Sequence, residues 1–113
     1  MKQGEIWLIN LNPTIGSEIK KTRPCVILNN DAIGVLPLKV IAPLTDYKEN
    51  YEKVLWFVKL QPNRNNGLSK LSAIDLFQVK SVSEERFIRK IGQLYSEELE
   101  KVKYALKLVF DIT

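Results

Sequence analysis

The hydrophobic residues of this 113-residue chain fall into short runs, and only the last segment shows helical spacing. Runs rich in β-branched and aromatic residues, separated by turn formers, are typical of short strands. The expected strands cover 4–10, 23–29, 38–44, 54–60, 73–79 and a short 88–94. From Leu99 to Phe110 the apolar residues recur every three or four positions, which predicts a helix over about 97–110. This pattern favours a mainly β fold, a small and strongly curved β-barrel with a C-terminal helix.

Length and composition indicate one domain spanning residues 1–113. A hydrophobic content of 45% and a charged content of 27% fit a globular chain rather than a disordered one. No apolar stretch approaches the roughly 18 residues of a membrane span, and the first residues contain no signal-peptide core. We therefore expect a cytoplasmic protein without membrane contact.

The chain contains no histidine and a single cysteine, Cys25. This excludes Ser–His and Cys–His nucleophile pairs and the two-histidine route of hydrolytic ribonucleases. It also removes the usual zinc ligands, so we expect neither a metal nor a cofactor. Cys25 lies in an apolar run, where a buried thiol is expected. The formal net charge of +4 is compatible with a nucleic-acid partner without establishing one.

The connection between the first two expected strands is long and rich in polar groups. Residues 13–24 read PTIGSEIKKTRP, whereas a connection that only reverses the chain needs about two to five residues. Such a loop on a rigid scaffold is typical of a functional site. Arg23 follows it directly and suits phosphate recognition, because a guanidinium is planar, always charged and donates in a fork. The plain alternative is a solvated surface arginine.

Four more loop residues are candidates for the same site. Glu18 could pair with Arg23 or act as a base, and these roles compete because an arginine partner depresses the pKa of a carboxylate. A surface ion pair is the plain alternative for Glu18. Lys20 and Lys21 would attract a polyanion or be solvated charge. Ser17 offers a hydroxyl and an N–H, or ordinary turn chemistry.

Three positions near strand ends could complete a groove. Thr45 follows the third expected strand, and its hydroxyl could donate to a phosphate oxygen or only cap a turn. Gln78 and Lys80 would share one face of the fifth expected strand and its extension. That face would change from core to polar rim, where base edges could be read. In the plain alternative the strand exits into solvent there.

Three blocks of the sequence follow one another in order. The first and most specific is Gly4-Glu5-Ile6-Trp7, Pro13, Gly16-Ser17-Glu18 and Arg23-Pro24-Cys25-Val26-Ile27; the later two are 40–45 and 68–94. Together these blocks resemble the MazF/PemK/Kid toxin family. The resemblance implies a homodimeric SH3-like barrel of the CcdB/PemK type. It also implies a toxin that cleaves single-stranded mRNA at short sequence motifs without a metal. The implied partner is a cognate antitoxin protein whose flexible segment covers the RNA groove.

The resemblance also assigns roles by position. Arg23 matches the family's essential arginine, Thr45 its essential threonine, and Glu18 a loop carboxylate near the active site. The implied reaction is attack of a ribose 2′-hydroxyl on the adjacent phosphorus, which gives a cyclic phosphate and a free 5′-hydroxyl. Arg23 and Thr45 would hold the phosphate oxygens.

The third block departs from the family pattern. Gln78 matches the strand that helps to line the RNA site, but many members carry an acidic residue directly before it. Here that residue is Phe77, with Asp75 two positions earlier, and Lys80 replaces a frequent arginine. The general base is therefore open between Glu18, Asp75 and another group. The RNA sequence that is recognised is open as well.

Two other functions remain in competition. The first is a gyrase-binding toxin like CcdB, whose family binds its target through a C-terminal end containing tryptophan. This chain instead ends Phe110-Asp111-Ile112-Thr113, and its tryptophans are Trp7 and Trp56. The second is a catalytically inactive RNA-binding barrel, which Phe77 keeps open.

Overall fold

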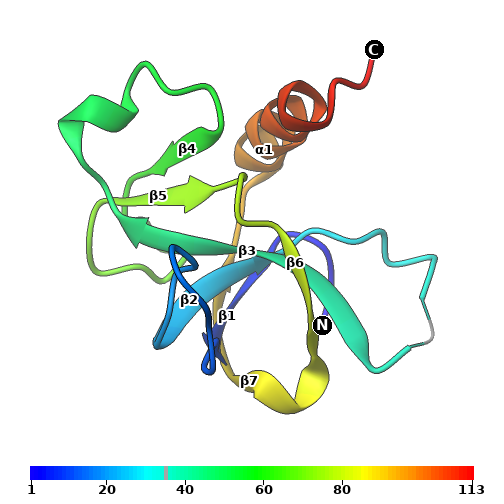
Figure 1. Ribbon diagram of the computed structural model, residues 1–113. Coiled ribbons are helices and arrows are strands. Elements are labelled where there is room, and N and C mark those ends of the chain that lie inside the picture. Colours follow the sequence, from blue (N-terminus) through cyan, green and yellow to red (C-terminus); the bar gives the residue numbers. More distant parts are fainter. Residues whose placement is uncertain (35) are drawn as a thin grey trace.

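The computed structural model describes residues 1–34 and 36–113, which form a curved antiparallel sheet and one helix (Figure 1). The elements are β1 (Glu5–Asn10), β2 (Thr22–Ile27), β3 (Leu38–Asp46), η1 (Glu49–Tyr51), β4 (Phe57–Leu60), β5 (Ser72–Asp75), β6 (Lys80–Ser83), η2 (Glu84–Arg86), β7 (Phe87–Gln93) and α1 (Ser96–Phe110). The strand order is β4-β5-β3-β2-β1-β7, with β6 paired to β3. The predicted mainly β class with a C-terminal helix is confirmed.

The long strand β3 joins the two halves of the sheet. Its residues 41–43 pair with β2, while residues 38–41 pair with β6 and residues 44–46 with β5. β3 therefore passes through the centre of the molecule, with two successive partners along one edge (Figure 1). Because β2 and β3 are antiparallel, the start of β2 lies beside the end of β3. This arrangement places the end of the loop 13–21 next to the C-terminal end of β3.

The expected strand over 73–79 is wrong beyond Asp75. β5 ends there because the Asp75 carboxylate accepts the amide N–H of Phe77 at 3.0 Å and the Asp75 carbonyl accepts the N–H of Gln78 at 3.2 Å. An aspartate that bonds two residues ahead forms a turn in place of a ladder. β6 then begins at Lys80 and pairs further along β3. Gln78 consequently lies on a turn and does not share a strand face with Lys80.

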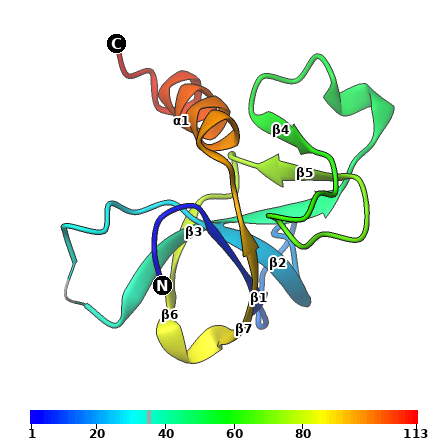
Figure 2. The ribbon, with the colours of Figure 1, turned by 180° about the vertical axis from the view of Figure 1, so that it is seen from behind.

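Two apolar clusters lie on opposite sides of the sheet. The first core contains Ile6, Val26, Leu28, Ala42, Leu44, Val58, Leu60, Ile74, Leu76, Leu94, Val102 and Ala105. The second core contains Ile9, Leu11, Cys25, Ile27, Ile41 and Val82. α1 covers the first core with one apolar stripe, as predicted, and lies next to β4 and β5 (Figure 2). Within the described residues, no helix is long and apolar enough to cross a membrane.

The buried thiol predicted for Cys25 is confirmed, since the side chain is fully buried in the second core. Burial raises the pKa of Cys25 to about 12, and the nearby positive charges of Lys80 and Arg23 offset only part of that rise. Because the thiolate is the reactive form, we expect iodoacetamide at pH 8 to label the folded protein on the order of 10³-fold more slowly than the urea-unfolded protein. Mass spectrometry of timed samples measures both rates. Similar rates in the two states would contradict the burial of this thiol.

Candidate active site

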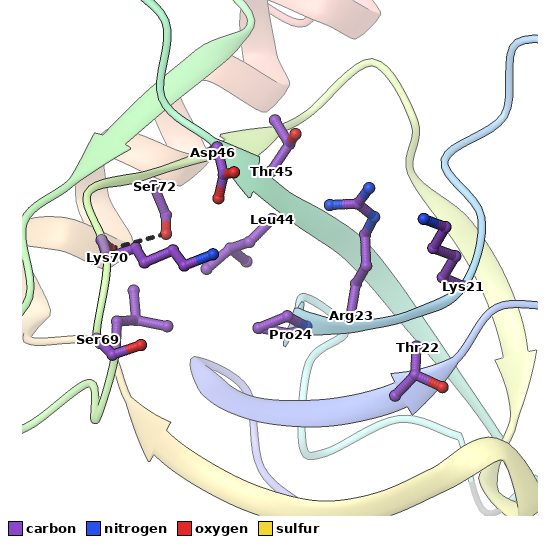
Figure 3. A pocket seen from close by; sticks show the side chains of 11 residues that line it. Lys21, Thr22, Arg23, Pro24, Leu44, Thr45, Asp46, Ser69, Lys70 and Ser72 are labelled. Atoms are coloured by element: carbon purple, nitrogen blue, oxygen red, sulfur yellow. Dashed lines mark hydrogen bonds between the residues drawn. The ribbon is translucent and has the colours of Figure 1, made fainter.

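A cleft of about 330 Å³ opens between the start of β2, the end of β3 and the connection between β4 and β5 (Figure 3). Its lining consists of Lys21, Thr22, Arg23, Pro24, Leu44, Thr45, Asp46, Leu68, Ser69, Lys70 and Ser72. Three segments that are far apart in the sequence thus converge on one hollow. Lys21, Arg23 and Thr45 of the expected site are among them.

Arg23 and Thr45 face the cleft as cross-strand neighbours. The β2–β3 register pairs Cys25 with Pro43, and the same register continued by two residues sets Arg23 opposite Thr45. Both side chains are half-buried, and the guanidinium of Arg23 extends toward Thr45 (Figure 3). The Nε–H of Arg23 donates to the carbonyl of Lys20 at 3.1 Å, and this hydrogen bond orients the guanidinium. The pair can therefore present a fork of N–H donors and a hydroxyl to one anion.

Two lysines add positive charge to the walls of this cleft. Lys21 extends beside Arg23, and Lys70 reaches into the hollow from the opposite wall (Figure 3). Asp46 contributes one carboxylate at the end of β3. The excess of cations over carboxylates in the lining favours a phosphate ligand.

Lys70 was not predicted from the sequence. It belongs to a connection rich in asparagine and glycine, and nothing local indicates which strand that connection approaches. The polar pair Ser69-Lys70, one residue before β5, is the one signal that could have pointed to it. Its place opposite Arg23 depends on the packing of the connection between β4 and β5.

The loop is closed at its base by its own backbone and by two side chains. The N–H of Leu11 donates to the carbonyl of Lys21 at 3.1 Å, and the N–H of Lys21 donates to Oδ1 of Asn12 at 3.1 Å. The guanidinium of Arg86 donates to the carbonyls of Asn10 and Asn12. These bonds hold the two ends of the loop together beside the cleft.

Two other predicted loop residues, Ser17 and Glu18, line a second hollow. It is formed by Ile15, Ser17, Glu18, Phe77, Gln78, Val79 and Lys80. Of the alternatives for Glu18, the structure shows a surface ion pair and not a pairing with Arg23. One carboxylate oxygen accepts the N–H of Ile15 at 2.7 Å, and the other lies 3.7 Å from Nζ of Lys80. Lys20 is exposed and lines neither hollow. The structure thus divides the predicted site into a cleft around Arg23 and a hollow around Glu18, joined by the loop.

Asp75 lies outside the lining of both hollows. Its side chain is only 6% exposed, because it is folded into the turn that ends β5. Burial raises the pKa of the Asp75 carboxyl above its ordinary value, and hydrogen bonds with Phe77 and Gln78 offset part of that rise. In this position the carboxylate organises the backbone of the turn.

Two signature residues near the N-terminus also bond to each other, away from the cleft. Nε1 of Trp7 donates to Oε1 of Glu5 at 2.9 Å, and Nζ of Lys90 lies 3.3 Å from Oε2 of Glu5. Burial would raise the pKa of Glu5, but the hydrogen bonds from Trp7, the Lys2 backbone and Lys90 outweigh it and hold that pKa below its ordinary value. Glu5 and Trp7 therefore contribute to the fold of β1 and β7.

Metal ligands do not gather in the part of the chain that the structure describes. Among residues 1–34 and 36–113, no three His, Cys, Asp or Glu side chains lie together as a group that could hold an ion. The cations of the cleft are its principal charged groups.

Comparison with known proteins identifies relatives over the whole chain. The family model of the PemK-like, MazF-like toxins of type II toxin–antitoxin systems matches residues 2–110. Endoribonuclease MazF9 of Mycobacterium tuberculosis is 32% identical over 118 residues, which cover 99% of this chain and 98% of that protein. Endoribonuclease EndoA of Bacillus subtilis is 30% identical over 110 residues, or 96% and 92% of the two chains.

Solved structures share the fold at lower sequence identity. A mycobacterial endoribonuclease in complex with its cognate antitoxin superimposes with a TM-score of 0.79 at 14% identity, covering 100% of this chain and 97% of that one. MazF from Deinococcus radiodurans superimposes with a TM-score of 0.79 at 21% identity, covering 99% and 97%. The family model and the sequence relatives together lead to one conclusion: this chain belongs to the PemK-like, MazF-like toxins of type II toxin–antitoxin systems.

Proposed function

We propose that this toxin is an endoribonuclease that cleaves single-stranded mRNA at short sequence motifs, without a metal ion. The observation that carries the proposal is the cleft in which Arg23 and Thr45 face each other on neighbouring strands, with Lys21 and Lys70 in its walls. The names of the curated relatives, endoribonuclease MazF9 and endoribonuclease EndoA, support the same activity.

The proposed reaction is an internal transfer within the RNA. The 2′-oxygen of one ribose bonds to the adjacent phosphorus while the bond from phosphorus to the 5′-oxygen of the next nucleotide breaks. The 2′-hydroxyl proton goes to a base, and the leaving 5′-oxygen gains a proton, so the products are a cyclic phosphate and a 5′-hydroxyl. Arg23 and Thr45 bind the non-bridging oxygens as charge builds on them. Preorganised donors of this kind contribute on the order of 10²–10³ in rate each.

Glu18 is the more accessible of the two candidate proton acceptors, and it can act on RNA that spans both the cleft around Arg23 and the hollow around Glu18. Its carboxylate is 47% exposed and lines the hollow beside the loop, whereas Asp75 is buried in a turn. A guanidinium with a pKa above ~12 is a poor proton donor, so Arg23 acts as a phosphate clamp. Ser17, Lys20, Lys21 and Lys80 would bind the RNA on either side of the scissile bond.

The expected partners follow from this activity. We infer a cytoplasmic site of action, where mRNA is present, and a cognate antitoxin, as in the mycobacterial complex. We also infer a homodimer, since Leu55, Phe77 and Phe110 expose more than half of their apolar side chains. Sedimentation at micromolar concentration tests the dimer, and a monomer at that concentration would contradict it.

A long RNA incubated with the protein and EDTA, followed by mapping of the cut ends, tests the proposed reaction. We expect cuts at one short motif, with cyclic phosphate and 5′-hydroxyl ends. A single 2′-deoxynucleotide at the scissile position should abolish cutting, because it removes the nucleophile. Cleavage of that strand would refute the mechanism, and tight binding without any cleavage would favour an inactive RNA-binding barrel. Gyrase stalling with intact RNA would favour a function like that of CcdB.

Lys70→Ala is expected to weaken RNA binding in a salt-dependent way. One phosphate contact to a single strand contributes about 0.7 to the slope of log K against log salt concentration. We therefore expect the slope to fall by about this amount, measured with a non-cleavable 2′-deoxy-substituted strand. Lys107→Ala, on the exposed side of α1, is the matched control and should leave the slope unchanged. Equal slopes for the two variants would remove Lys70 from the site.

A further inference from the structure

We propose that Gln78 is a positioning residue, which orients Arg23 through the backbone of loop residues Ile19 and Lys20. Sequence reasoning assigned Gln78 to RNA contact. The catalytic consequence of this inference rests on the proposed function, but the structural part does not.

The side-chain amide of Gln78 is engaged with the backbone of the loop. Its Oε1 accepts the N–H of Ile19 at 2.7 Å, and its Nε2 makes a longer contact of 3.5 Å with the carbonyl of Ser17. These bonds span 59 and 61 residues of sequence. Ile19 is also partly buried against the second core. Gln78 therefore anchors the middle of the loop to the turn between β5 and β6.

The anchored segment is the one that holds Arg23. Lys20 directly follows Ile19, and its carbonyl accepts the Nε–H of Arg23 at 3.1 Å. On the other side Lys21 is held by Asn12 and has a positive φ of 74°. A non-glycine residue keeps such a conformation only where its surroundings determine it. The Lys20 carbonyl thus lies between two residues whose backbone is held by a side chain: Gln78 binds Ile19, and Asn12 binds Lys21.

The position of Gln78 is itself determined by Asp75. The N–H of Gln78 donates to the Asp75 carbonyl at 3.2 Å, and the Asp75 carboxylate accepts the N–H of Phe77 at 3.0 Å. The buried carboxylate thus sets the turn, and the turn presents the Gln78 amide to the loop. These bonds connect the buried end of β5 to the guanidinium in the cleft, although neither Asp75 nor Gln78 lines that cleft.

Two replacements of Gln78 separate positioning from RNA contact. Gln78→Met keeps the length of the side chain and removes the acceptor, whereas Gln78→Glu keeps an acceptor for the Ile19 N–H. Gln93→Met, at an exposed position of β7, is the matched control. The readouts are hydrogen exchange of the Ile19 amide, the NMR signal of the Arg23 Nε–H in RNA-free protein, and kcat and KM for RNA cleavage.

We expect Gln78→Met to speed exchange of the Ile19 amide at least about 10-fold and to shift or broaden the Arg23 Nε–H signal. Because misplacement of a catalytic group by about 1 Å costs up to about 10²-fold, kcat should fall about 10–100-fold while KM stays within about twofold. Gln78→Glu should restore protection of the Ile19 amide. Gln93→Met should change none of these quantities.

A direct role of Gln78 in RNA contact would give the opposite pattern. KM would then rise while kcat, Ile19 exchange and the Arg23 signal stayed as in the unmodified protein, and the proposal would be overturned. Altered exchange and signal with unchanged kcat would overturn the catalytic part of the proposal, because Arg23 would then be reoriented without any effect on cleavage. If the unmodified protein cleaves no RNA, the proposed function fails, while Ile19 exchange and the Arg23 signal still decide whether Gln78 orients the arginine.

Discussion

Arg23→Ala is expected to lower kcat for RNA cleavage on the order of 10²–10³-fold, the effect of removing one preorganised donor from an anionic transition state. Arg23 lies on β2, next to Thr45 on β3, and the Nε–H of its guanidinium donates to the carbonyl of Lys20. Arg23→Lys should recover little of the activity, because an ammonium cannot reproduce the planar fork of donors. Initial rates on a short RNA that contains the mapped motif give kcat for each variant.

Arg89→Ala provides the matched control for this loss. Arg89 is exposed on β7 and does not line the cleft. Its replacement by alanine removes one positive charge, as Arg23→Ala does. We expect this variant to retain kcat, with at most a small change in RNA affinity from the lower net charge. If both arginine variants lost activity equally, bulk charge rather than the cleft geometry would explain the effect, and the assignment of Arg23 would fail.

Asn66→Ala is expected to lower the free energy of unfolding by about 3 kcal/mol or more. Asn66 is completely buried; its Oδ1 accepts the N–H groups of Asn63 and Leu68 at 3.1 and 3.0 Å, and its Nδ2 donates to the Gln61 carbonyl at 2.8 Å. Truncation removes the partner of three backbone groups in partly buried hydrogen bonds, and a buried group left unpaired costs roughly 1–3 kcal/mol. Urea unfolding followed by tryptophan fluorescence measures the loss.

The surroundings of Asn66 leave little room to relax. A Cβ added at Gly92 of β7 would lie 2.5 Å from the carbonyl oxygens of Asn65 and Asn66, so the two backbones are already in close contact. The same connection carries Lys70 into the cleft, so we also expect lower RNA affinity. Asn50→Ala, at an exposed position of η1, should change the unfolding free energy by less than about 0.5 kcal/mol. A loss of under 1 kcal/mol at Asn66 would mean that water replaces the amide.

The errors of sequence reasoning lie where a side chain bonds to the backbone. The run from Ala73 to Val79 has the composition of one strand, yet the Asp75 carboxylate converts its middle into a turn. For Glu18, the sequence left open a pairing with Arg23, a role as a base and a plain surface ion pair, and the structure shows an ion pair with Lys80. The choice between such partners depends on which atoms the fold brings together.

The sequence by itself determined the class of elements, the apolar faces and the candidate phosphate-binding arginine. Strand alternation, turn formers and helical spacing depend on residues a few positions apart, so they can be read along the chain. Only the tertiary structure decided that Arg23 lies across from Thr45, that Lys70 enters the same cleft, and that Gln78 holds the loop. These relations depend on the register of antiparallel strands and on connections whose packing is set by distant side chains. The type of each side chain is known from the sequence, but the residue that it contacts is determined by the tertiary structure.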